Sequence, residues 1–153
     1  DHVAFGLVGS APNVTDIVAI AIAAAEAGSH ALSLTNTLIG MAIDHDKADS
    51  VLGTVTGGIS GPALKPVSLA MVYKTYRAVD IPIMGIGGIE TTDDALDYIY
   101  AGARAIQIGT ANFASPNTPQ DVLGGLERYM NRKKVKSMAD LVGLAHGGTL
   151  FTP

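Results

Sequence analysis

Two glycine-rich turns are the segments of this chain best suited to bind a ligand. Gly85-Ile86-Gly87-Gly88 and Gly109-Thr110-Ala111-Asn112 each follow a short apolar run and precede a segment with helical character. Glycine lets a ligand approach the backbone, and the N–H groups at the start of a helix attract anions. Parallel barrels hold phosphate in the loops after their last two strands. The sequence therefore predicts a phosphate site at Gly87, Gly88, Gly109 and Thr110. The alternative is that these glycines serve only tight packing between strand and helix.

A second candidate is Thr35-Asn36-Thr37, a run of hydrogen-bonding residues directly after an apolar strand. Asparagine carries both hydrogen-bond donors and an acceptor, so such a cluster can form hydrogen bonds with the edge of a planar polar ring. Residues 39–56 follow, a segment much longer than the usual βα loop of about 2–6 residues. We expect this excursion to close over the site, with a short ribbon returning through Val51–Val55. Its polar tip consists of Asp44, His45, Asp46, Lys47 and Asp49. The alternative is that Asn36 only caps the turn.

Several other kinds of site are not indicated. The chain has no cysteine, which excludes disulfides, thiolate metal sites and a cysteine nucleophile. The four histidines are scattered without metal-ligand spacing, so no metal site is expected. Asp93, Asp94 and Asp97 are interpreted as helix-dipole partners and solvated surface, and Lys65 as a surface lysine of a helix.

The overall composition is that of a globular protein with few charges. Hydrophobic residues make up 48% of the 153 positions and charged residues only 16%. The net charge of −4 gives no reason to expect nucleic acid or an anionic membrane as a partner. No apolar run reaches the roughly 18 residues of a membrane span. The absence of cysteine fits a cytosolic protein, and we expect a cytoplasmic location.

Strand and helix patterns alternate along the chain, which predicts an α/β fold with a parallel sheet. The four apolar runs, typical of strands buried on both faces, are Val3–Val8, Ala31–Leu34, Ile81–Ile86 and Ala105–Ile108. The helical patterns are Ile17–Ala27, Pro62–Ala78, Ala95–Ala101 and Val122–Arg132, with a final short one at Met138–Leu144. We expect one domain over residues 1–146 and a loose tail over residues 147–153.

Five segments together resemble class 1B dihydroorotate dehydrogenase. They occur in that family's order and spacing from Ala11 to about His146. They are Pro12-Asn13-Val14-Thr15-Asp16-Ile17, Asn36-Thr37-Leu38-Ile39-Gly40-Met41-Ala42-Ile43-Asp44, Thr56-Gly57-Gly58-Ile59-Ser60-Gly61-Pro62-Ala63, Gly85-Ile86-Gly87-Gly88-Ile89 and Gly109-Thr110-Ala111-Asn112-Phe113. The set is specific although each segment alone is not.

The resemblance implies a fold, a reaction and a set of roles. The family is an FMN-dependent (β/α)8 (TIM) barrel that oxidises dihydroorotate to orotate in pyrimidine biosynthesis. Its class 1B members pass electrons to NAD through a partner subunit carrying FAD and an iron–sulfur cluster. Carried over by position, Thr35 would touch the flavin, and Asn36 with Thr37 would bind orotate. The residues that would hold FMN are Gly61, Gly87, Gly88, Gly109 and Thr110.

The chain departs from the family pattern in three respects. It corresponds only to strands five to eight, a half barrel of about four βα units. The family's catalytic base is a cysteine on a loop of the other half, and this sequence contains no cysteine. A lysine near the end of strand five contacts the flavin in the family, and Gly9 stands in its place here. In an alternative alignment, Val3-Ala4-Phe5-Gly6 resembles the stretch just after the catalytic loop, with a helix and most of strand five deleted.

Four strands cannot close a barrel, so two edges and the inner face of the sheet stay open. We expect a homodimer or a complex with a complementary half; the alternative is rearrangement into a sheet with helices on both faces. Three functional hypotheses follow: a flavoenzyme-derived domain, a non-catalytic FMN- or phosphate-binding half barrel, and a structural fragment that binds nothing.

Overall fold

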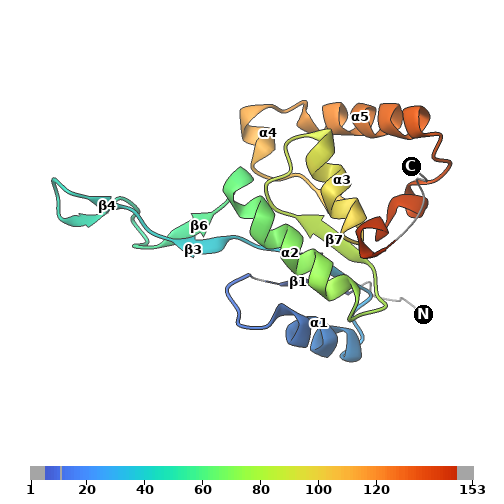
Figure 1. Ribbon diagram of the computed structural model, residues 1–153. Coiled ribbons are helices and arrows are strands. Elements are labelled where there is room, and N and C mark those ends of the chain that lie inside the picture. The colour runs from blue at the N-terminus through green and yellow to red at the C-terminus, as the bar shows by residue number, and fades with distance from the viewer. Residues whose placement is uncertain (1–5, 11, 148–153) are drawn as a thin grey trace.

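Four parallel strands form the central sheet of the computed structural model, which describes residues 6–10 and 12–147 (Figure 1). The strands are β1 (Leu7–Ser10), β2 (Ala31–Leu34), β7 (Ile83–Ile86) and β8 (Ala103–Gln107), and they lie side by side in chain order. Leu7 pairs with Ala31, and Leu32 pairs with Ile83. Because all four strands are parallel and adjacent, their carboxyl ends share one edge of the sheet. The predicted parallel α/β architecture is confirmed.

The helices begin and end at residues whose chemistry explains the boundary. They are α1 (Ile17–Glu26), α2 (Lys65–Tyr76, preceded by the 3-10 turn η1, Pro62–Leu64), α3 (Thr92–Tyr100), α4 (Ala111–Ala114), α5 (Thr118–Lys133), η2 (Met138–Leu141) and η3 (Leu144–His146). The Asp16 carboxylate accepts a hydrogen bond from the Val18 amide at 2.9 Å and so caps α1. Gly28 and Gly102 follow α1 and α3 with φ of +90° and +117°, a left-handed conformation that favours glycine.

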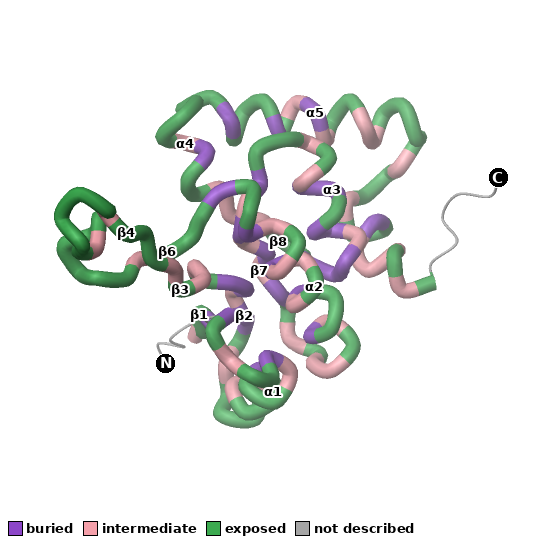
Figure 2. The backbone as a smooth tube through the Cα atoms, turned by 60° about the vertical axis from the view of Figure 1, so that its left-hand side comes forward, coloured by how far each residue is buried: buried purple, intermediate pink, exposed green. Residues whose placement is uncertain are grey.

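The helices pack against one face of the sheet, and the core lies between them (Figure 2). Leu32, Leu34 and Ile83 project from that face into a buried cluster with Val72 of α2 and Tyr98 of α3. The opposite face carries side chains that are only half-buried: Ser33, Met84, Ile86 and Gln107. This one-sided layering is that of a barrel wall. The alternative of a sheet with helices on both faces does not describe the arrangement.

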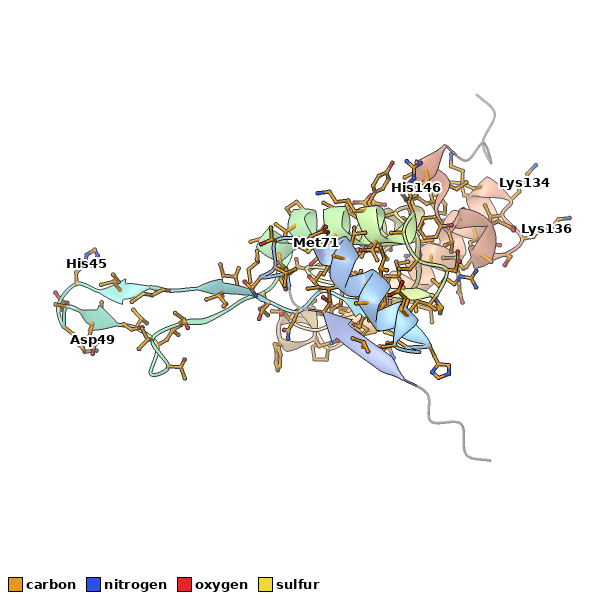
Figure 3. The ribbon with its side chains drawn as sticks, turned by 90° about the horizontal axis from the view of Figure 1, so that it is seen from below. His45, Asp49, Met71, Lys134, Lys136 and His146 are labelled. Carbon is orange, nitrogen blue, oxygen red and sulfur yellow. The ribbon has the colours of Figure 1, made fainter. Side chains whose placement is uncertain are left out.

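A long arm leaves the sheet between β2 and α2 (Figures 1 and 3). It is an antiparallel ribbon in which β3 (Leu38–Gly40) pairs with β6 (Gly57–Ile59), and β4 (Ile43–Asp44) pairs with β5 (Asp49–Ser50). An ion pair of 2.9 Å joins Lys47 to Asp44 at the predicted polar tip. Two expectations were wrong. The arm extends away from the sheet instead of closing over the site, and residues 51–55 form bends and turns instead of the returning strand.

The strand boundaries differ from the prediction because they are set by pairing with residues on the neighbouring strands. β1 extends to Ser10, two residues beyond the predicted end at Val8, because Leu34 of β2 pairs with Ser10. β7 begins at Ile83, after Pro82, which has no amide to donate to a ladder. β8 spans Ala103–Gln107, two residues earlier at its start than predicted. Residues 1–5, including Val3-Ala4-Phe5, lie outside the described residues.

Two features at the helix level also differ from expectation. The predicted Met138–Leu144 helix is two 3-10 turns, because Val142 is extended and Gly143 is left-handed with φ +78°. The short helix α4 was not predicted. No helix in the part of the chain that the structure describes is long and apolar enough to cross a membrane. Of the predicted tail, residues 148–153 lie outside that part.

Candidate functional site

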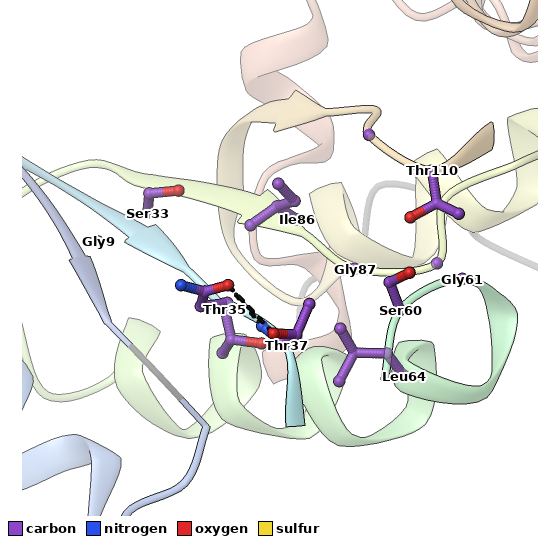
Figure 4. Close-up of a pocket in the computed structure, with 13 residues that line it drawn as sticks. Gly9, Ser33, Thr35, Thr37, Ser60, Gly61, Leu64, Ile86, Gly87 and Thr110 are labelled. Atoms are coloured by element: carbon purple, nitrogen blue, oxygen red, sulfur yellow. Dashed lines mark hydrogen bonds between the residues drawn. The ribbon is translucent and has the colours of Figure 1, made fainter. Parts of the chain in front are cut away.

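A pocket of about 260 Å³ lies at the carboxyl edge of the sheet (Figure 4). All eight residues predicted for the cofactor and substrate line it, so four separate strand ends meet in one place. The lining residues are Gly9, Ser33, Thr35, Asn36, Thr37, Ser60, Gly61, Leu64, Ile86, Gly87, Gly88, Gly109 and Thr110. Sequence reasoning did not single out Ser33, Ser60, Leu64 and Ile86 for the site. Alternation along β2 places Ser33 on the face opposite the buried Leu32 and Leu34, which is the signal that could have found it.

Gly87 and Gly88 form a turn whose conformation requires glycine. Their φ angles are +135° and +65°. A β-carbon on Gly88 would lie 2.6 Å from the carbonyl oxygen of Gly61 and 2.9 Å from Cβ of Lys65. The amide of Gly88 donates no hydrogen bond to any other residue that the structure describes. The turn therefore offers a free amide at the pocket wall, as an anion requires.

Gly109 and Thr110 form the second wall of this part of the pocket. A β-carbon on Gly109 would meet no atom within 4 Å, so the space in front of it is open. Thr110 is the N-cap of α4, and its side chain makes no capping hydrogen bond. Its hydroxyl and the adjacent backbone are thus available to a ligand. This cradle, which a side chain at Gly109 would fill, fits a phosphate group.

Asparagine side chains shape the loop that leaves β2. The Asn36 Oδ1 atom accepts a hydrogen bond of 2.7 Å from the Thr37 amide, which leaves the amide end of Asn36 free (Figure 4). Asn13 bridges two backbone groups of the loop: it donates to the Thr37 carbonyl and accepts from the Ile39 amide, both at 2.9 Å. Asn36 is exposed and Thr37 is half-buried. Asn13 is therefore a positioning residue for the predicted substrate-binding pair.

The inner face of the sheet is polar where it meets the pocket. Ser33 of β2 donates a hydrogen bond of 3.0 Å to Oε1 of Gln107 of β8, across the intervening strand β7. Gly9, on β1, stands at the far side of the pocket, and a β-carbon there would meet no atom within 4 Å. Gly9 was predicted to replace a lysine that contacts the flavin. The position is open enough to accept a long side chain.

An ion-pair cluster lies behind the Gly88 turn. Lys65, at the start of α2, pairs with Asp94 and, at 2.7 Å, with Asp97 of α3. Burial opposes ionisation of Asp94, but hydrogen bonds from Lys65, Thr91 and the backbone outweigh it and lower its pKa to about 2. Burial likewise opposes the charge on Lys65, yet the two carboxylates raise its pKa. Lys65 is thus paired with both Asp94 and Asp97. Asp94 lies in the first turn of α3, as predicted for a helix-dipole partner, but it is half-buried and not solvated surface. Within the described ranges, no three His, Asp or Glu side chains lie close enough to hold a metal ion.

The fold and the site define part of a parallel barrel with an anion cradle at the carboxyl edge. Residues 6–130 match the family model described as "Dihydroorotate dehydrogenase". The chain therefore belongs to the dihydroorotate dehydrogenase family, as its motifs indicated.

Individual relatives agree with this assignment. The chain is 53% identical over 132 residues to the catalytic subunit of dihydroorotate dehydrogenase B (NAD(+)) of Pelobacter propionicus, an alignment covering 86% of this chain and 43% of that relative. The corresponding subunit of Desulforamulus reducens is 50% identical over 135 residues, covering 88% of this chain and 44% of the relative. The chain thus spans less than half the length of these curated relatives.

Solved structures confirm the partial barrel. The crystal structure of the Eimeria tenella dihydroorotate dehydrogenase (DHODH) in complex with ferulenol superposes with a TM-score of 0.78 at 32% sequence identity. The match covers 94% of this chain and 39% of that one. The ligand-free form of the same enzyme gives a TM-score of 0.77. The four βα units therefore correspond to about half of a dihydroorotate dehydrogenase barrel.

Proposed function

We propose that this chain supplies the phosphate side of an FMN site for dihydroorotate oxidation. The observation that supports this most directly is the meeting of Gly87, Gly88, Gly109 and Thr110 at one wall of the pocket. These residues would hold the phosphate of FMN through backbone N–H groups, and the free amide of Gly88 and the open space at Gly109 fit such a group. Gly61, which is buried beside them, would complete the cradle.

The remaining residues would serve the flavin ring and the substrate. Thr35 lies at the pocket floor with 2% of its surface exposed and would contact the ring. Asn36 and Thr37, held in place by Asn13, would bind dihydroorotate or orotate through the free amide end of Asn36 and the Thr37 hydroxyl. Bound FMN would supply acceptance of a hydride from C6 of dihydroorotate, while the chain positions both molecules. The family's base for removing the proton from C5 is a cysteine, and this sequence contains none.

A complete site would need a second chain or the remainder of a barrel. By family resemblance, electrons would pass from FMN to NAD through a partner subunit with FAD and an iron–sulfur cluster. The two relatives described above are catalytic subunits of dihydroorotate dehydrogenase B (NAD(+)), which supports this assignment of partners. The second candidate function is a non-catalytic FMN- or phosphate-binding half barrel. The absence of cysteine from the sequence favours it for the chain acting alone.

The ultraviolet–visible spectrum of the purified chain after incubation with FMN and gel filtration tests the proposal. We expect flavin absorption to co-elute with the protein. Bleaching of that absorption by dihydroorotate under anaerobic conditions would support the dehydrogenase, and retention without bleaching would support the non-catalytic half barrel. A protein fraction without flavin would refute the dehydrogenase and FMN binding by the half barrel.

A further inference from the structure

A series of buried hydroxyl groups joins the floor of the pocket to the Gly87 turn. Thr35 of the β2 loop hydrogen-bonds to Ser68 of α2, and the phenol of Tyr98 of α3 donates a hydrogen bond of 2.7 Å to the Gly87 carbonyl. Ser68 and Tyr98 each have 0% of their surface exposed. Neither residue lines the pocket. Any effect they have on a ligand must therefore pass through Thr35 and Gly87.

Ser68 and Tyr98 converge on the α-carbon of Gly87. A β-carbon placed there would lie 2.5 Å from the Ser68 hydroxyl oxygen and 3.2 Å from the Tyr98 hydroxyl oxygen. Burial raises the pKa of the Tyr98 phenol to about 12, and the neighbouring Ser68 hydroxyl opposes that rise. The phenol therefore keeps its proton, and its hydrogen bond to Gly87, across the neutral pH range.

The Tyr98 proton is given to the Gly87 carbonyl, whereas either hydroxyl of the Thr35–Ser68 pair can be the donor. A buried hydroxyl left without a partner costs about 1–3 kcal/mol, so both hydrogen bonds are expected to be kept.

We propose that Ser68 and Tyr98 are positioning residues that fix the Gly87–Gly88 turn for phosphate and couple it to Thr35 at the ring side. The inference rests on the proposed function. Two consecutive glycines have a wide choice of backbone torsions, so the turn needs a constraint from outside itself. The hydrogen bond from Tyr98 to the Gly87 carbonyl supplies it from a rigid helix. The structure thus gives α2 and α3 a role in cofactor affinity although neither of these two side chains reaches the cofactor.

Comparison of FMN with riboflavin, which lacks the phosphate, tests the positioning role. Tyr98→Phe removes the hydrogen bond to Gly87 and leaves the Thr35–Ser68 hydrogen bond in place. We expect it to weaken FMN binding roughly fivefold to tenfold and to leave riboflavin binding unchanged. Ser68→Ala also releases Thr35, so it should weaken both ligands. A Tyr98→Phe chain whose FMN-to-riboflavin affinity ratio equals that of the wild type would overturn the proposal, and so would a Ser68→Ala chain with both affinities unchanged.

Two matched controls separate positioning from general loss of stability. Thr75→Val removes another fully buried hydroxyl of α2, one that has no hydrogen-bond partner. Tyr100→Phe removes a phenol hydroxyl of α3 that pairs with Tyr129, away from the pocket. Both should keep the wild-type ratio of the two affinities. A control that lowers the ratio as much as Tyr98→Phe does would overturn the assignment.

Amide hydrogen exchange extends the test to a chain that binds no flavin. In the free protein, peptides covering residues 84–91 should exchange faster in Tyr98→Phe and Ser68→Ala than in the wild type, with Thr75→Val unchanged. Equal exchange in all four proteins would overturn the inference. Failure of the proposed function looks different: the wild type would then bind neither FMN nor riboflavin, while the exchange difference at the turn would persist.

Discussion

The ammonium group of Lys65 pairs with the carboxylate of Asp94, and the same carboxylate closes the N-terminus of α3. Its Oδ2 atom accepts hydrogen bonds from the amides of Glu90 and Thr91, at 3.1 and 2.8 Å, while the Thr91 hydroxyl accepts from the Asp94 amide. This capping box directly follows the Gly87–Gly88 turn in the chain. Lys65 therefore joins α2 to the end of the loop proposed to bind phosphate.

The first prediction concerns the stability of this cluster in acid. The pKa of Asp94 is depressed to about 2 from an ordinary value of 3.8. Its contribution is therefore complete above pH 3.8 and is lost as the pH falls toward 2. We expect Asp94→Asn to lower the free energy of unfolding at pH 7 by about 2 kcal/mol. Urea titrations at pH 7 and pH 2.5 should show the difference between variant and wild type shrinking in acid.

Asp93→Asn is the matched control for that experiment. Asp93 also lies in the first turn of α3, but it is exposed and takes no part in the capping box. Its substitution should change stability by less than about 0.5 kcal/mol. Equal losses in the two variants would show that helix charge alone accounts for the effect.

The second prediction concerns the phosphate cradle. Gly88 is a poor position to block, because a side chain there would clash with the backbone at Gly61. Gly109→Val should instead fill open space, and we expect at least a tenfold loss of FMN affinity with little change in melting temperature. Gly53→Val in the arm, where a β-carbon also meets no atom within 4 Å, is the control. Unchanged FMN affinity in Gly109→Val would contradict the phosphate assignment.

The third prediction concerns the cation that Gly9 replaces. Gly9→Lys would place an ammonium group at an exposed position of the pocket wall without a clash. A nearby cation stabilises a reduced, anionic flavin, so the midpoint potential of bound FMN should rise. For an interaction of about 1 kcal/mol, the rise is about 20–30 mV. Spectroelectrochemical titration of Gly9→Lys and of Gly9→Gln separates the effect of charge from that of side-chain size. Equal midpoint potentials in the two variants would show that the flavin ring does not lie near residue 9.

The fourth prediction concerns turnover. A positioned general base contributes about 10²–10⁴-fold to rate, and this sequence has no cysteine to provide the family's base. We expect dihydroorotate oxidation by the isolated chain to be very slow or undetectable, even with FMN in excess. Orotate formation can be followed by its ultraviolet absorption. Robust turnover would point to a base elsewhere in the chain.

The fifth prediction concerns association. β1 and β8 each form a free edge of the central sheet, and Leu7 and Val8 of β1 are 43% and 37% exposed. Open edges and half-exposed apolar residues favour pairing with another chain. We expect a homodimer or a complex with a complementary half barrel. Sedimentation equilibrium over a wide concentration range would show the dimer, whereas a monomer at high concentration would contradict the prediction.

Much of the site could be predicted from sequence because glycine and capping chemistry are local. Gly87 and Gly88 have torsions that favour glycine, and Thr91 with Asp94, three residues later, forms a capping box that caps α3. Parallel strands then bring separate strand ends to one edge, so the predicted residues that follow β2, β7 and β8 had to be neighbours. The family's motifs carried the same information as fixed residue types at fixed spacing.

Only the tertiary structure decided which buried residues support the pocket and in which direction the arm between β2 and α2 extends. Ser68 and Tyr98 are ordinary helix residues in the sequence, and only packing of α2 and α3 against β7 brings their hydroxyls to Gly87. The pairing of Lys65 with Asp94 spans two helices and leaves no periodic signal. The arm's direction depends on the pairing of β3 with β6 over a long separation, which no local pattern encodes. The backbone torsions of a turn or a helix end follow from the local residue types, whereas contacts between distant segments exist only once the chain has folded.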